Sequence, residues 1–169
     1  MITVAWSVGL LCVKAELAEV EKHSFLDVFY KSKEGLHFED VTSITMDNAL
    51  GVGYLEPWTL IFDVHARFIS NQQIALELSK KFKVKAFYIS ESLVFRDYHF
   101  GFIKKGGLKR EVLGIAAGHN YLLSKGIKAI DEWGETIIMQ IIESEILSNI
   151  EEDFIDTVWK LSFAKYELD

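Results

Sequence analysis

The chain has 169 residues, of which 50% are hydrophobic and 25% charged, and its formal net charge is −7. This length suffices for one domain with its own core, and the composition excludes an intrinsically disordered chain. The single cysteine, Cys12, excludes an intramolecular disulfide, and no apolar run approaches the roughly 20 residues of a membrane-spanning helix. The first residues lack the basic region of a secretory signal. We therefore expect one cytoplasmic domain over residues 1–169.

The N-terminal part of the chain predicts a strand followed by a helix. Residues 10–15 form an apolar run typical of a buried or edge strand. A helix is expected from Glu16 onwards, because carboxylates fall in its early turns, where the helix dipole favours them. Residues 31–53 are polar and interrupted by glycines. Their segments 37–41 and 43–46 fit either short strands or one helical turn.

A second strand and helix follow. Proline is tolerated at the first residue of a strand, so Pro57 is consistent with a strand over residues 58–65. Ser70 and Gln73 have the spacing of a capping box, in which the serine oxygen accepts a free backbone N–H of the first helical turn. The apolar residues after this box recur at helical spacing, which predicts a helix as far as Phe82.

The next segments predict a β-hairpin. Residues 83–90 are apolar on both faces, as in an inner strand. Residues 93–103 and 108–113 form two strands, and the Gly-Gly pair at 106–107 supplies the positive φ angles of a tight turn between them. Antiparallel pairing is expected here. Residues 114–128 are interpreted as a connection because they contain three glycines.

Two helices are expected near the C-terminus. The first has acidic residues in its first turn, at 131–132, and an apolar stripe that begins at Trp133. The second begins at the capping box of Ser148 and Glu151, although the alternation over residues 159–163 leaves a strand open there. The predicted fold is a single α+β domain with a mostly antiparallel sheet of about five or six strands, packed helices and two C-terminal helices. All four tryptophans are assigned to the core: Trp6, Trp58, Trp133 and Trp159.

Short catalytic and cofactor-binding motifs are absent from the sequence. It contains no glycine-rich nucleotide-binding loop, no GxSxG, no HExxH and no CxxC, so no cofactor is expected. Cys12 lies among apolar neighbours, which favours a buried, inert thiol over a nucleophile.

One pattern suggests chemistry. Asp63 with His65, and Asp97 with His99, are two Asp-x-His pairs, and each places both side chains on one face of its predicted strand. If the two strands are neighbours, the four side chains could bind a divalent metal that activates water for hydrolysis. The alternatives are solvent-facing strand residues, His–carboxylate hydrogen bonds, or a surface that contacts a partner.

The negative charge is concentrated in the last third of the chain. Residues 1–109 carry 13 Lys and Arg against 13 Asp and Glu, whereas residues 110–169 carry 5 against 12. Nucleic-acid binding requires basic clusters that neutralise phosphates, so this distribution argues against it. A basic protein is the natural electrostatic partner. The alternative is an acidic surface that only maintains solubility.

Four segments resemble small acidic bacterial proteins encoded beside polymorphic or contact-dependent toxins, the immunity proteins and related uncharacterised families. The segments are residues 10–20, 57–63, 75–79 and 100–110. The resemblance implies a non-catalytic domain that binds and blocks a toxin, and it implies no particular site residues.

The leading functional hypothesis is therefore a protein-binding module, and the resemblance implies an immunity protein that neutralises a basic toxin. Its predicted interface is acidic and consists of Glu143, Glu145, Glu151, Glu152, Asp153 and Asp156. The first alternative is a metal-dependent hydrolase built on the Asp-x-His pairs. The second is a homo-oligomeric structural protein.

Overall fold

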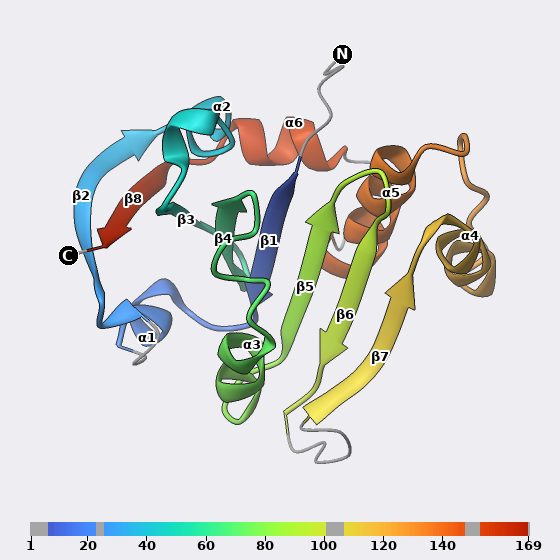
Figure 1. The fold of residues 1–169 in the computed structure, drawn as a ribbon, viewed down its shortest axis with the longest axis horizontal. Helices are drawn as coiled ribbons and strands as arrows, with labels where there is room; N and C mark the ends of the chain where they lie inside the picture. Colours follow the sequence, from blue (N-terminus) through green and yellow to red (C-terminus); the bar gives the residue numbers. More distant parts are fainter. Residues whose placement is uncertain (1–6, 23–25, 101–106, 148–152, 169) are drawn as a thin grey trace.

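Eight strands form one antiparallel sheet in the computed structural model, which describes residues 7–22, 26–100, 107–147 and 153–168 (Figure 1). Their spatial order is β2-β8-β3-β4-β1-β5-β6-β7, and every neighbouring pair is antiparallel. The strands are β1 (Val8–Val13), β2 (Phe29–Leu36), β3 (Ala49–Leu55), β4 (Trp58–Val64), β5 (Val84–Ile89), β6 (Val94–Tyr98), β7 (Leu108–Leu113) and β8 (Phe163–Leu168). The predicted α+β class is confirmed.

Helices cover both faces of the sheet (Figure 1). They are α1 (Leu17–Glu21), α2 (Phe38–Val41), α3 (Gln72–Ser79), α4 (Ile115–Ser124), α5 (Gly134–Ile146) and α6 (Phe154–Trp159), with a short 3-10 helix, η2 (Ile44–Met46). One face packs against α2, α4, α5 and α6, and the other against α1 and α3. Within the described ranges, no helix combines the length and apolar character needed to cross a membrane.

The centre of the sheet is formed by β1 and β4, in which every residue is buried. Their apolar runs are buried on both faces because helices lie above and below them, which is the environment that favours continuous rather than alternating hydrophobicity. β1 is therefore a central strand and not an edge strand. Pro57 precedes β4 in a two-residue turn after β3, and its peptide bond with Glu56 is cis.

Two strands, β2 and β3, overlap residues 31–53, where the sequence shows no clear element. β2 is an edge strand whose six inner positions are exposed, so it has no apolar alternation to detect. β3 is buried but contains Gly51 and Gly53. A Cβ at Gly51 would lie 2.4 Å from a Val41 carbon, and one at Gly53 would lie 2.5 Å from the Phe163 ring. These glycines therefore mark close packing within a strand rather than a turn.

In the C-terminal segment the helix is shorter than predicted, and a strand follows it. α6 begins after Asp153 and ends at Trp159, and β8 then inserts between β2 and β3. Phe163 pairs with Gly53, and its ring fills the space that a side chain at Gly53 would occupy. The capping box expected at Ser148 lies outside the described residues.

Other local predictions need smaller corrections. The N-cap of α3 is Asn71 and not Ser70, since the Asn71 side chain accepts the N–H of Gln73 at 3.1 Å. The predicted capping box needs the Gln73 side chain to accept the backbone N–H of Ser70, but that N–H is already bonded to the carbonyl of Ala66. The segment expected as a connection contains α4, in which Gly118 allows Leu93 and Ile137 to pack closely. In the short segments before β3, the helical alternative is correct.

The hairpin prediction is confirmed by the antiparallel pairing of β6 and β7. β6 ends at Tyr98, earlier than expected, and Gly107 has a φ of 98°. Residues 101–106, which include Gly106, lie outside the described part of the chain.

Candidate functional site

The two Asp-x-His pairs do not meet. β1 and β5 lie between β4 and β6, which separates the two predicted ligand strands by about 14 Å. Asp63 lies on the sheet face covered by α3, whereas Asp97 lies on the face covered by α5. In the described ranges, no three His, Cys, Asp or Glu side chains are grouped so as to hold a metal ion. The predicted shared metal site is therefore wrong.

Each aspartate instead has a local role. Asp63 accepts the backbone N–H groups of Phe68 and Ile69 at 2.7 and 2.8 Å, so it holds the turn after β4. His65 lies in that turn with a φ of 65°, outside the strand and exposed, because the alternation of side chains ends at Val64.

His99 is half-buried just after β6, and its backbone N–H donates to the carbonyl of Gly107. Burial, together with the positive charges of Lys109 and Lys83, lowers the pKa of His99. The negative charge of Asp97 opposes this shift.

Asp97 belongs to a buried ion network that fixes α5 to the sheet. Lys85 Nζ lies 2.7 Å from Glu145 Oε2 and 3.4 Å from Asp97 Oδ1. Lys125 Nζ approaches Glu145 from α4 at 3.9 Å. The Glu145 side chain is only 10% exposed, so it is not available as part of a partner-binding surface. The neighbouring Cys12 is buried, which raises the pKa of its thiol and agrees with the prediction of an inert group.

The rest of the predicted acidic interface is divided. Glu143 is half-buried, and its Oε2 accepts the N–H of Phe154 at 2.9 Å, so it fixes the start of α6. Burial raises the pKa of Glu143. Asp153 caps α6 through the N–H of Ile155, and both Asp153 and Asp156 are exposed. Glu151 and Glu152 lie outside the described residues.

Two tryptophans assigned to the core lie at the surface. Trp133 is 67% exposed and Trp159 is 48% exposed, whereas Trp58 is buried as expected and Trp6 lies outside the described residues. The apolar spacing of the sequence predicts Trp133 on the buried stripe of this helix, but Trp133 is the N-cap of α5 and so precedes the first turn. The sequence feature that indicates this helix start is Asp131. Its Oδ1 accepts the N–H of Trp133 at 2.9 Å in an Asx-type turn, a local bond that aspartate favours just before a helix.

Trp133 is part of an exposed apolar surface where three junctions of the fold meet. The β7–α4 junction is tied to the β5–β6 turn by the backbone N–H of Gly114, which donates to the carbonyl of Leu93, the residue before β6. The start of α5 abuts the β5–β6 turn, since a Cβ at Gly134 would lie 2.1 Å from the carbonyl oxygen of Glu91 (Figure 1). We define the Trp133 surface as the exposed apolar residues of α4 and of the α4–α5 loop at these junctions: Ile115, Ile130 and Trp133.

The loop that carries Trp133 is held by internal hydrogen bonds. The buried side chain of Gln140 accepts the N–H of Ile130 at 3.1 Å and donates to the carbonyl of Lys128 at 3.0 Å. With the Asp131 bond and the contact at Gly134, these bonds fix the loop on both sides of Trp133. An exposed aromatic residue on a fixed loop loses little conformational entropy when it binds.

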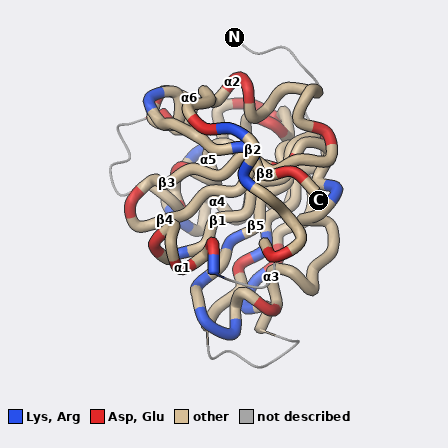
Figure 2. Tube along the Cα trace, turned by 90° about the vertical axis from the view of Figure 1, so that its left-hand side faces the viewer, with Lys and Arg blue, Asp and Glu red and all other residues tan. Residues whose placement is uncertain are grey.

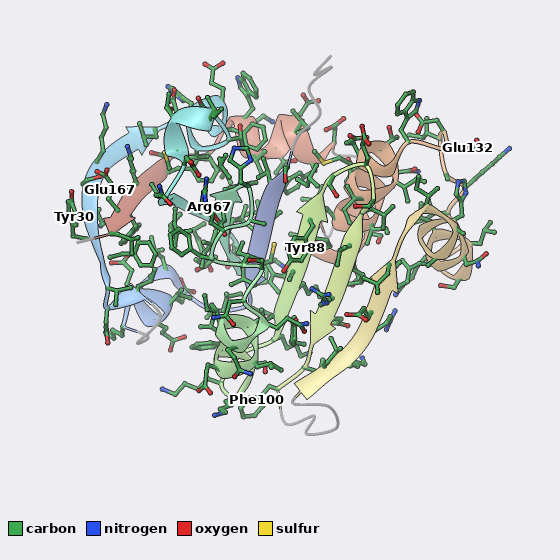
Figure 3. All side chains as sticks on the ribbon, viewed as in Figure 1. Tyr30, Arg67, Tyr88, Phe100, Glu132 and Glu167 are labelled. Carbon is green, nitrogen blue, oxygen red and sulfur yellow. The ribbon has the colours of Figure 1, made fainter. Side chains whose placement is uncertain are left out.

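The rim of the Trp133 surface is acidic. Glu91, Glu132 and Glu135 lie in the segments that form it, and in the described part of the chain no cation pairs with these three carboxylates. Glu132 lies on the loop between α4 and α5 at the outer edge of the molecule (Figure 3). Residues 90–93, 111–117 and 129–136 contain no Lys or Arg. The surface thus combines an apolar centre with unpaired negative charge.

Comparison with protein-family models, with curated proteins and with solved structures finds no match to this chain. The resemblance to immunity proteins therefore depends on the four sequence segments alone.

Proposed function

We propose that this protein is a non-catalytic protein-binding module that takes a basic protein partner on the Trp133 surface. The observation that carries the proposal is the combination of Trp133, 67% exposed on a fixed loop, with an acidic rim that lacks internal ion pairs. Tryptophan is enriched among the residues that contribute most to protein–protein binding, and contiguous exposed apolar patches mark interaction sites.

Charge complementarity selects the kind of partner. The rim carboxylates of Glu91, Glu132 and Glu135 would accelerate association with a basic surface and repel an acidic one. The proposed interface therefore differs from the one predicted from the sequence. Glu143 and Glu145 bind groups within the protein, and of the predicted set the described residues that remain exposed are Asp153 and Asp156. The resemblance to immunity proteins suggests the setting, a cytoplasmic protein that blocks a basic toxin.

The test is selection from a displayed library of random peptides about 30 residues long, which span up to about 100 Å when extended. Binders selected on the wild-type protein should be enriched in Lys and Arg next to aromatic or large aliphatic residues. Their affinity should fall about tenfold or more when the rim is reversed in Glu91→Lys/Glu132→Lys/Glu135→Lys. Raising the salt concentration should weaken the wild-type complex more than the complex of the reversed variant.

A matched control is Glu19→Lys, which makes the same charge change on the exposed face of α1, far along the chain from the Trp133 surface. This variant should bind the selected peptides as the wild type does. Peptides without basic enrichment, or equal losses in Glu19→Lys and in the reversed-rim variant, would contradict the proposal.

A further inference from the structure

A second exposed tryptophan lies in a similar setting at α2 and α6. The Trp159 ring packs against Phe38 of α2 with centroids 6.0 Å apart, yet 48% of the residue remains exposed. Ile44, in η2 directly after α2, is 73% exposed. α6 and α2 are far apart in the sequence but lie in contact here, and η2 is in contact with α2. The exposed large apolar residues of α6 and η2 are Trp159 and Ile44.

The charge of this second surface is also mainly acidic. Glu39 of α2 and Asp156 of α6 are exposed, and among the described residues neither forms an ion pair. Asp156 precedes Trp159 by three residues, so the two side chains share one face of α6. Acidic segments lie on α2 and α6 in Figure 2, and the basic residue Lys160 follows α6 directly.

Helix α5 connects the two surfaces. Trp133 caps its N-terminus, and Glu143 in its last turns binds the first N–H of α6, so α6 begins about 15 Å along the α5 axis from Trp133. In Figure 1, α2, α6, α5 and the α4–α5 loop follow one another along the same edge of the molecule. Both tryptophans thus lie along one acidic edge.

We infer that a single basic partner spans this edge and contacts Trp159 as well as Trp133. The inference rests on the proposed function and extends it to a second contact area for the same partner. Two contacts with the same partner strengthen binding because, once the first has formed, the second forms within the same complex at a high effective concentration. The partner is therefore a basic surface or segment at least as long as the separation of the two tryptophans.

The test uses the selected peptide of about 30 residues and the indole N–H signals of the wild-type protein in a ¹H–¹⁵N spectrum, assigned with Trp→Phe variants. The indole signals of Trp133 and Trp159 should both shift with the same binding curve, while that of the buried Trp58 stays in place. Affinity for this peptide should fall about tenfold in Trp159→Ala. Because Trp159 contacts Phe38, Asp156→Lys provides a second variant at an exposed site, and its affinity should fall as well.

The outcomes separate the two proposals. If the Trp133 signal shifts while the Trp159 signal does not, and Asp156→Lys binds as the wild type does, the spanning inference is wrong and the proposed function stands. If the peptide binds and neither indole signal shifts, both are wrong.

Discussion

Asp63 is a buried carboxylate that holds the turn after β4. One of its oxygens accepts two backbone N–H groups, and the other, Oδ1, is buried without a hydrogen-bond partner among the described residues. Burial raises the pKa of this carboxyl, and the N–H donors from Phe68 and Ile69 oppose the shift only partly. The folded protein therefore binds the proton more tightly than the unfolded chain does.

We predict that Asp63→Ala lowers the free energy of unfolding at pH 7 by about 2 kcal/mol, because two backbone N–H groups lose their acceptor. Asp63→Asn should cost less, since its amide oxygen can accept both. Urea denaturation of the two variants and the wild type measures the difference. Equal losses in both variants would show that the acceptor role is not what Asp63 contributes.

The same residue should affect the pH dependence of stability. Because its folded pKa lies above the unfolded value of about 3.9, its contribution is complete below that value and declines as the pH rises through the folded pKa. The wild type should therefore lose stability relative to Asp63→Asn across that interval. Parallel pH profiles for the two proteins would contradict this assignment.

At the scale of elements, the ion network explains how α5 is fixed to the sheet. Lys85 lies between two carboxylates that are at most 10% exposed. Removing its charge takes away the ion-pair partner of Asp97 and leaves Glu145 with only the more distant Lys125, at 3.9 Å. We predict that Lys85→Met lowers the free energy of unfolding at pH 7 by about 3 kcal/mol or more, and that the loss shrinks at acidic pH, where the carboxylates are protonated.

A matched control for that substitution is Lys80→Met. Lys80 also pairs with a carboxylate, Glu77, at 2.9 Å, but both side chains are more than half exposed. Its removal should change stability by less than about 0.5 kcal/mol. Chemical denaturation of both variants checks the prediction, and similar losses in the two would show that the buried network contributes no more than a surface pair.

The packing of β8 against β3 depends on Gly53. A methyl group there would lie 2.5 Å from the Phe163 ring, so we predict that Gly53→Ala lowers the free energy of unfolding by about 2 kcal/mol. Adding Phe163→Leu should recover part of this loss, because the smaller side chain makes room for the methyl group. A double-mutant cycle in urea measures the coupling, and strictly additive losses would contradict the proposed contact.

At the scale of the whole molecule, the sequence predicted most of the sheet because its central strands follow simple rules. β1, β4, β5 and the β6–β7 hairpin are apolar runs or alternations with clear boundaries. β2 escaped detection because an exposed edge strand has no apolar pattern, and β3 because its glycines make room for side chains of other elements. What makes these two segments strands is therefore their packing against other elements and not a pattern in their own residues.

The candidate site was predicted less well, for a related reason. Net charge points to the last third of the chain, but it does not show that Glu143 and Glu145 bind internal partners. The apolar stripe placed Trp133 in the core, whereas its position as N-cap places it at the surface. Exposure depends on where a helix begins, and periodicity determines helix boundaries poorly.

The measurement that tests the central claim most directly is the affinity of the selected peptide for Trp133→Ala, measured by calorimetric titration. Trp133 is exposed, so its removal should leave the fold intact, which circular dichroism checks. We predict a loss of about 30-fold, the effect of removing one dominant contact of about 2 kcal/mol. The control is Tyr30→Ala on β2, an aromatic residue 48% exposed at the edge of the sheet distant from Trp133 (Figure 3). Its affinity should stay within about twofold of the wild type. An unchanged affinity in Trp133→Ala, or equal losses in both variants, would contradict the account.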